Sequence, residues 1–119
     1  MIFRAYMGEI TRLQRYLKGE IALRFYISGQ ITDNPSYKDD FERAEDYLQK
    51  EYPEAEIINP VLVNSFLPKS TEYEDYMRMS MVMLDMCSHI YFIKGWQDSK
   101  GANWEMGYAL ASGKNMLFE

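Results

Sequence analysis

The sequence has few of the residues that form covalent links or bind metals. Only one of its 119 residues is cysteine, Cys87, and only one is histidine, His89. A single cysteine forms no disulfide within the chain, and one cysteine with one histidine supplies too few ligands for a zinc site. We therefore expect no metal site, no other cofactor, and a reducing, cytoplasmic location.

Long apolar runs and excess positive charge are also lacking. No run approaches the roughly 20 apolar residues of a membrane span, and the first 20 residues lack the core and cleavage site of a signal peptide. Lys and Arg number 13 against 18 Asp and Glu, which gives a net charge of −5. Such a chain has no general attraction to polymeric nucleic acid, although a helix N-terminus can still bind one phosphate of a small ligand. We expect no membrane or nucleic-acid partner.

The composition otherwise fits one folded domain, because 47% of the residues are apolar and 26% are charged. Residues 21–119 are predicted to form this domain. Residues 1–20 are predicted to form a helical extension that packs on the domain or on a neighbour, because apolar residues recur there at helical spacing. These residues are Ile10, Leu13, Tyr16 and Leu17.

Strands and helices are predicted to alternate along the domain. The predicted strands are short runs rich in β-formers, and they cover residues 21–28, 56–59, 89–93 and 115–118. The predicted helices cover residues 34–52, residues 71–87 with a Thr71/Glu74 capping box, and the stretch from the end of a 96–101 loop to Ser112. Residues 60–68 are predicted as loop.

This alternation predicts a three-layer αβα fold with a mostly parallel, flavodoxin- or Rossmann-like sheet of about four to five strands. Ligands of such sheets bind beyond the carboxyl ends of the strands, where the strand order reverses. The loops that follow the first three strands are therefore the candidate binding region. They cover residues 29–34, 59–63 and 94–101.

Glu105 is the candidate reactive group. It is predicted near the start of the last helix, where the helix dipole favours a carboxylate by about 0.3–1 kcal/mol, so we expect it to be ionised. An ionised carboxylate beside a sugar-sized pocket is suited to attack an anomeric carbon.

The spacing around Glu105 resembles a known signature. The pattern S-x-G-x-x-x-E-x-G-x-A resembles that of nucleoside 2-deoxyribosyltransferases and of deoxynucleoside 5′-monophosphate N-glycosidases. It is met by Ser99, Gly101, Glu105, Gly107 and Ala109. The stretch from Ile21 to Glu119 looks closest to DUF4406, a family common in phage and bacterial genomes.

The resemblance implies a small nucleoside or nucleotide as the substrate. The resemblance also implies that Glu105 is the nucleophile. We further expect Asp98 to act as the acid/base residue, with Trp96 and Asn59 flanking the base. The other implied substrate contacts lie in the first glycine loop and around the start of the last helix. These are Tyr26, Ser28, Gly29, Thr32, Ser99 and Gly101.

Two positions depart from the pattern of the enzymes. Ser80 and Ser88 stand where those relatives carry aspartate, and a serine is no proton donor at neutral pH. Asp98 or Asp85 could substitute for the missing acid. Two functions remain open: an enzyme that cleaves an N-glycosidic bond, and a binding or sensing module that kept the pocket without the catalysis.

Three further features allow more than one interpretation. Gly29 could serve a turn with positive φ or a close approach to a ligand, and Trp96 could stack on a base or cover the core. Methionines on all sides of the second long helix favour a homodimer or a larger homo-oligomer. They are Met77, Met79, Met81, Met83 and Met86.

Overall fold

The computed structural model describes residues 11–119, so the prediction that includes Ile10 lies partly outside the described residues. Its sheet has four parallel strands in the order β2-β1-β3-β4. The strands are β1 (Arg24–Ser28), β2 (Glu56–Ile58), β3 (His89–Phe92) and β4 (Asn115–Phe118). The predicted parallel α/β fold is confirmed. The chain crosses from β2 on one side of β1 to β3 on its other side, so β1 and β3 flank the point where the strand order reverses.

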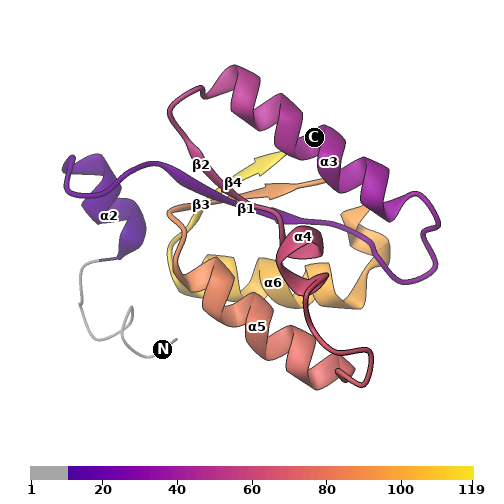
Figure 1. Ribbon diagram of the computed structural model, residues 1–119. Helices are drawn as coiled ribbons and strands as arrows, with labels where there is room; N and C mark the ends of the chain where they lie inside the picture. The colour runs from indigo at the N-terminus through magenta and orange to yellow at the C-terminus, as the bar shows by residue number, and fades with distance from the viewer. Residues whose placement is uncertain (1–10) are drawn as a thin grey trace.

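Helices cover both faces of the sheet (Figure 1). α3 (Tyr37–Glu51) lies on one face, while α5 (Tyr73–Asp85) and α6 (Lys100–Ala111) lie on the other. The shorter helices are α2 (Arg12–Leu17), α4 (Pro60–Asn64) and the 3₁₀ turn η1 (Trp96–Asp98). Within residues 11–119, no helix combines the length and apolar character that crossing a membrane requires.

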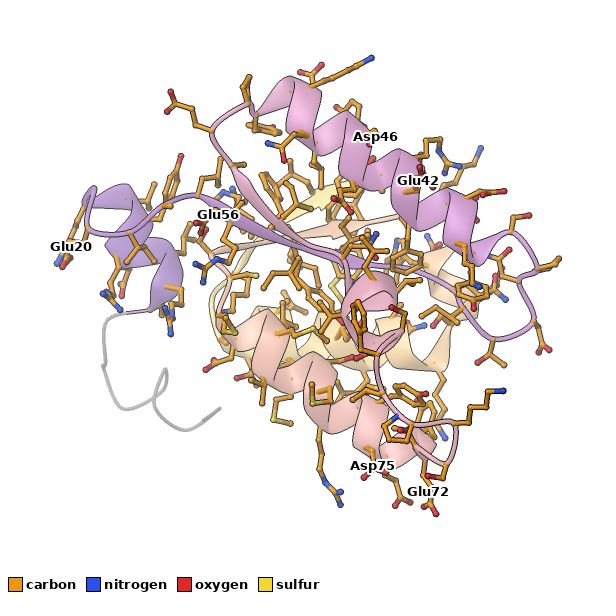
Figure 2. All side chains as sticks on the ribbon, in the orientation of Figure 1. Glu20, Glu42, Asp46, Glu56, Glu72 and Asp75 are labelled. Carbon is orange, nitrogen blue, oxygen red and sulfur yellow. The ribbon has the colours of Figure 1, made fainter. Side chains whose placement is uncertain are left out.

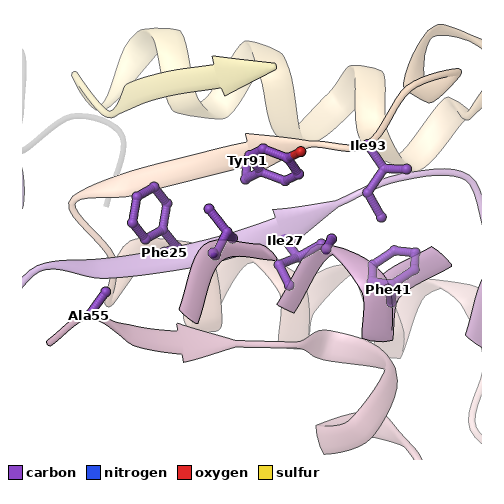
Figure 3. Packing of buried hydrophobic residues seen from close by; sticks show 8 residues of the cluster. Phe25, Ile27, Phe41, Ala55, Tyr91 and Ile93 are labelled. Carbon is purple, nitrogen blue, oxygen red and sulfur yellow. The ribbon is translucent and has the colours of Figure 1, made fainter. Parts of the chain in front are cut away.

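Alternation along β1 divides the core into two parts. Phe25 and Ile27 pack under α3 with Tyr91 and Ile93, as Figure 3 shows. Tyr26 faces the opposite side and packs with residues of α5 and α6. Because side chains two apart share a face, Ser28 points to the α6 side as Tyr26 does.

Several helix starts differ from the predictions. α3 begins at Tyr37, three residues after the predicted start at residue 34, and Ser36 is its N-cap. The capping box of α5 is formed by Glu72 and Asp75 rather than by Thr71 and Glu74, and the Thr71 hydroxyl instead donates to the Pro68 carbonyl at 2.6 Å. Residues 60–64, predicted as loop, form α4. The signal was present, because Asn59 caps this helix through Val61 N–H at 3.0 Å and proline occupies its first position.

α2 is tied to the sheet by an aromatic contact. The Tyr16 ring meets the His89 ring edge to face at 5.3 Å. Leu17, at the end of the same helix, is 70% exposed. The described part of the extension therefore rests on the amino ends of the strands, away from the predicted ligand edge.

Candidate functional site

The Glu105 carboxylate lies beneath the end of β1 and accepts two hydrogen bonds from that strand. The Tyr26 hydroxyl donates to Oε2 at 2.5 Å, and the Ser28 hydroxyl donates to Oε1 at 2.7 Å. Each carboxylate oxygen therefore has one donor on β1. β1 places both hydroxyls on one face because they are two residues apart, and α6 carries Glu105 across that face.

A third hydroxyl comes from α5. Ser80 is buried, and its side chain is among the hydrogen-bonding groups that lower the pKa of Glu105. The position that we predicted as a lost acid therefore belongs to the site. Its place in the site could have been predicted from the sequence. Ser80 shares a helix face with Tyr73 and Met77, because residues at i, i+4 and i+7 lie on one side of a helix.

Burial works against the ionised form of Glu105 that we expected. The residue is only 6% exposed, and burial raises its pKa, while the hydroxyls of Tyr26, Ser28 and Ser80 act in the opposite direction. The helix dipole does not provide the predicted stabilisation, because Glu105 is the sixth residue of α6 and the dipole acts mainly within the first turn. The expectation that the dipole keeps Glu105 ionised was wrong, and the three hydroxyls are the groups that favour the charged form.

The start of α6 lies beside the start of α5. The Ser99 hydroxyl caps α6 by accepting from Ala102 N–H at 3.1 Å. A Cβ added to Gly101 would lie 3.5 Å from Met77 Sδ and 3.8 Å from the Tyr73 hydroxyl, which is ordinary contact distance. Gly101 therefore leaves room for at most a small group between these helices.

Gly29 is required for space and not for its backbone conformation. Positive φ among the glycines described is found at Gly19, Gly95 and Gly113, and Gly29 is not one of them. A Cβ at Gly29 would lie 3.1 Å from both Cβ and Cδ1 of Ile93, which the backbone hydrogen bond from Ile93 N–H to the Ser28 carbonyl holds alongside. The turn that needs positive φ lies after β3, at Gly95, with a φ of 89°.

The remaining predicted site residues surround the carboxylate less closely. Asn59 is buried, and its amide donates to Glu45 Oε1 at 3.0 Å while its carbonyl oxygen caps α4. Trp96 is half-buried and packs on the Phe92 ring at 4.9 Å, so it covers the core. Thr32 and Asp98 are exposed. Among the hydrogen bonds of residues 11–119, none joins either of these two to Glu105.

Asp85 is also engaged elsewhere. Its carboxylate accepts from the Tyr108 hydroxyl at 2.9 Å. Asp85 is five residues from Ser80 and lies on a different face of α5. Ser88 lies at the opposite end of the sheet, where its hydroxyl is 2.7 Å from His89 Nδ1. Neither residue is brought to Glu105 by these contacts.

Two surface hollows lie away from the carboxylate. One of about 320 Å³ is lined by Arg43, Tyr47, Tyr91, Phe118 and Glu119. A second of about 310 Å³ opens beside α2 and includes Tyr16 and His89 in its wall. Glu105 lines neither of these two hollows.

A comparison with protein families shows to which family the chain belongs. The family DUF4406, described as a domain of unknown function, matches residues 23–118. The chain belongs to the DUF4406 family. None of the curated proteins matches it.

A solved structure shares the fold of this DUF4406 chain. It is a 2-desoxiribosyltransferase from Leishmania mexicana, with 22% sequence identity and a TM-score of 0.60. The alignment covers 81% of this chain and 63% of the Leishmania chain. The DUF4406 chain thus spans under two thirds of the length of that enzyme, and the likeness establishes a deoxyribosyltransferase-like fold.

Proposed function

We propose that this protein cleaves the N-glycosidic bond of a nucleoside or nucleotide, with Glu105 as the nucleophile. The observation that carries the proposal is the buried Glu105 carboxylate held by the hydroxyls of Tyr26 and Ser28 at the carboxyl end of β1. This edge is where parallel α/β sheets bind their ligands. The fold shared with the Leishmania 2-desoxiribosyltransferase supports the same class of reaction.

The two hydroxyls fix the direction of attack. With that of Ser80 included, three hydroxyls engage at most three of the roughly four lone-pair sites of a carboxylate, which leaves one for a carbon atom. One oxygen attacks C1′ and the bond from C1′ to the base nitrogen breaks, which leaves a glycosyl ester on Glu105. Attack on C1′ by water gives a free sugar, and attack by a second base gives a new nucleoside. The carboxylate is regenerated in both cases.

The start of α6 is the proposed contact for the 5′ end of the substrate. Ser99 caps the helix, and the helix N-terminus favours an anion such as a phosphate. Gly29, buried beside Ser28, is proposed to bring the first loop close to the sugar. Asp98 stands next to Ser99 but is exposed, so no acid/base role is proposed for it.

An assay of base release tests the proposal. The protein is incubated with deoxynucleosides, ribonucleosides and their 5′-monophosphates, and free base is measured by chromatography. We expect release that Glu105→Ala abolishes and that the matched control Glu42→Gln leaves unchanged, because Glu42 is exposed on α3 (Figure 2). Trapping of a glycosyl ester on the peptide that carries Glu105, detected by mass spectrometry, identifies the nucleophile.

A binding module is the alternative, and the serines at positions 80 and 88 favour it. Calorimetry with the same compounds distinguishes the two functions. Binding without base release supports the module, whereas neither binding nor release contradicts both.

A further inference from the structure

The Glu105 carboxyl group is buried, and none of the ion pairs in the described part of the chain includes it. The ion pairs within residues 11–119 join Arg24 to Glu56, Arg43 to Asp40 and Glu119, and Arg78 to Asp75. The groups that set the pKa of Glu105 are burial and three hydroxyls, with no charged side chain among them. Buried carboxylates are ordinarily paired with a cation, because an unpaired buried charge is costly.

The same site offers the departing base no good proton donor. Burial and the neighbouring Glu105 raise the pKa of Tyr26 well above its usual value, so this hydroxyl holds its proton firmly. The hydroxyls of Ser28 and Ser80 do not act as proton donors at neutral pH either. Asp85 is bound to Tyr108 and Asp98 is exposed on η1, as described above.

One kind of substrate would supply the missing cation and would also need no proton donor. Resting on the proposed function, we infer that the substrate is an N-glycoside whose base carries a fixed positive charge, such as a pyridinium or an N7-alkylated purine. Its cation supplies the missing partner of the Glu105 carboxylate. Its base leaves as a neutral molecule and needs no proton from the protein.

The reaction balances without an acid or a cofactor. A Glu105 oxygen forms a bond to C1′ while the electron pair of the C1′–N bond passes to the ring nitrogen and cancels its positive charge. Water then attacks C1′, the ester bond to Glu105 breaks, and the proton of that water passes to the solvent. The products are the neutral base, the sugar and one proton.

Matched substrate pairs test this inference. Guanosine is compared with 7-methylguanosine, and the neutral reduced form of nicotinamide riboside is compared with cationic nicotinamide riboside, each also as its 2′-deoxy form. Because an unpaired buried charge is costly and the cation supplies its partner, we expect kcat/KM for the cationic member of each pair, relative to its uncatalysed rate, to exceed that of the neutral member by at least about 100-fold. Each rate is divided by the uncatalysed rate of the same compound, so that the higher intrinsic reactivity of the cations does not produce the difference.

A variant that adds an acid gives an independent readout. Ser80→Asp places a carboxyl group beside Glu105, and we expect it to raise the turnover of guanosine while leaving 7-methylguanosine unchanged or slower. Ser80→Ala is the matched control and gives no such gain. Circular dichroism and thermal melting show whether each variant is folded.

The outcomes separate this inference from the proposed function. Equal corrected rates for neutral and cationic members overturn the cationic substrate and leave Glu105 chemistry standing. No turnover of any member by the unaltered protein overturns the proposed function itself. Preferential turnover of the cations that Glu105→Gln abolishes supports both.

Discussion

The hydroxyl of Tyr26 donates to Glu105 Oε2 at 2.5 Å, and both side chains are almost completely buried. Removing the hydroxyl leaves a buried carboxylate oxygen without its donor, which costs about 1–3 kcal/mol. We therefore expect Tyr26→Phe to lower the free energy of unfolding by that amount, measured by urea denaturation. Tyr47→Phe is the control, because Tyr47 is about half exposed on α3. Equal stability of the two variants would contradict the role given to this hydrogen bond.

Glu105→Gln should become more stable relative to the unaltered protein as the pH rises. Burial raises the pKa of Glu105 in the folded state, so the contribution of this group to stability is complete below its unfolded pKa and is lost as the pH rises through its folded pKa. Glutamine has no such dependence.

Unfolding free energies of both proteins measured from pH 4 to pH 8 check this expectation. The difference in favour of Glu105→Gln should grow across this range, and Glu42→Gln, on the exposed side of α3, should show no trend. A difference that shrinks with pH would mean that hydrogen bonding dominates over burial.

The contact between Gly29 and Ile93 predicts a strain that a second substitution relieves. A methyl group at Gly29 lies 3.1 Å from both Cβ and Cδ1 of Ile93, and overpacking of this kind costs about 1–3 kcal/mol. Ile93→Val removes Cδ1 and keeps Cβ, so it relieves part of the strain, and the two substitutions together should cost less than the sum of their separate effects in a double-mutant cycle of denaturant unfolding.

Gly95→Ala is the contrasting variant. No atom lies within 4 Å of the added methyl group, and the cost of about 1–2 kcal/mol comes from the positive φ alone. Ile93→Val should therefore leave the cost of Gly95→Ala unchanged. Relief by Ile93→Val at both glycines would show that the space beside Gly29 is not the cause.

His89 should titrate far below an ordinary histidine. Burial lowers its pKa to about 4, and its Nδ1 lies 2.7 Å from the Ser88 hydroxyl. As His89 is the only histidine in the chain, its ring proton signal can be followed by NMR without ambiguity. Because the folded pKa is lower than the unfolded value of about 6.5, this group also makes the protein less stable as the pH falls from about 6.5 to 4. A midpoint near 6.5 would place the ring in water instead.

The sequence predicted the sheet well because its strands are short apolar runs that end at glycine, proline or polar residues. Asn115–Phe118 matches its prediction at both ends, and the other strands differ by at most three residues at an end. The loop predicted over 60–68 failed, although the Asn59-Pro60 pair carried the signal of a helix start. A five-residue helix has too few turns for apolar periodicity to reveal it.

The site was predicted in part. Tyr26, Ser28 and Glu105 were selected from a resemblance, and the structure joins them by hydrogen bonds. The burial of Glu105 could not be read from its position near a helix start, because it depends on how α6 crosses β1. The contribution of Ser80 was not predicted. The sequence showed only that a serine stands where the related enzymes carry an acid, and the hydrogen bond of its hydroxyl to Glu105 depends on how α5 packs beside α6.

Glu105 is 79 positions along the chain from Tyr26 and 77 from Ser28. Closing loops of this size costs entropy that only the completed β1-β3 pairing and the docking of α6 can repay. The hydrogen-bonded arrangement around Glu105 therefore exists only when the domain is assembled from its first strand to its last helix. The proposed activity would serve as an all-or-none reporter of native folding, and a proteolytic cut anywhere between β1 and α6 that lets the halves separate would abolish it.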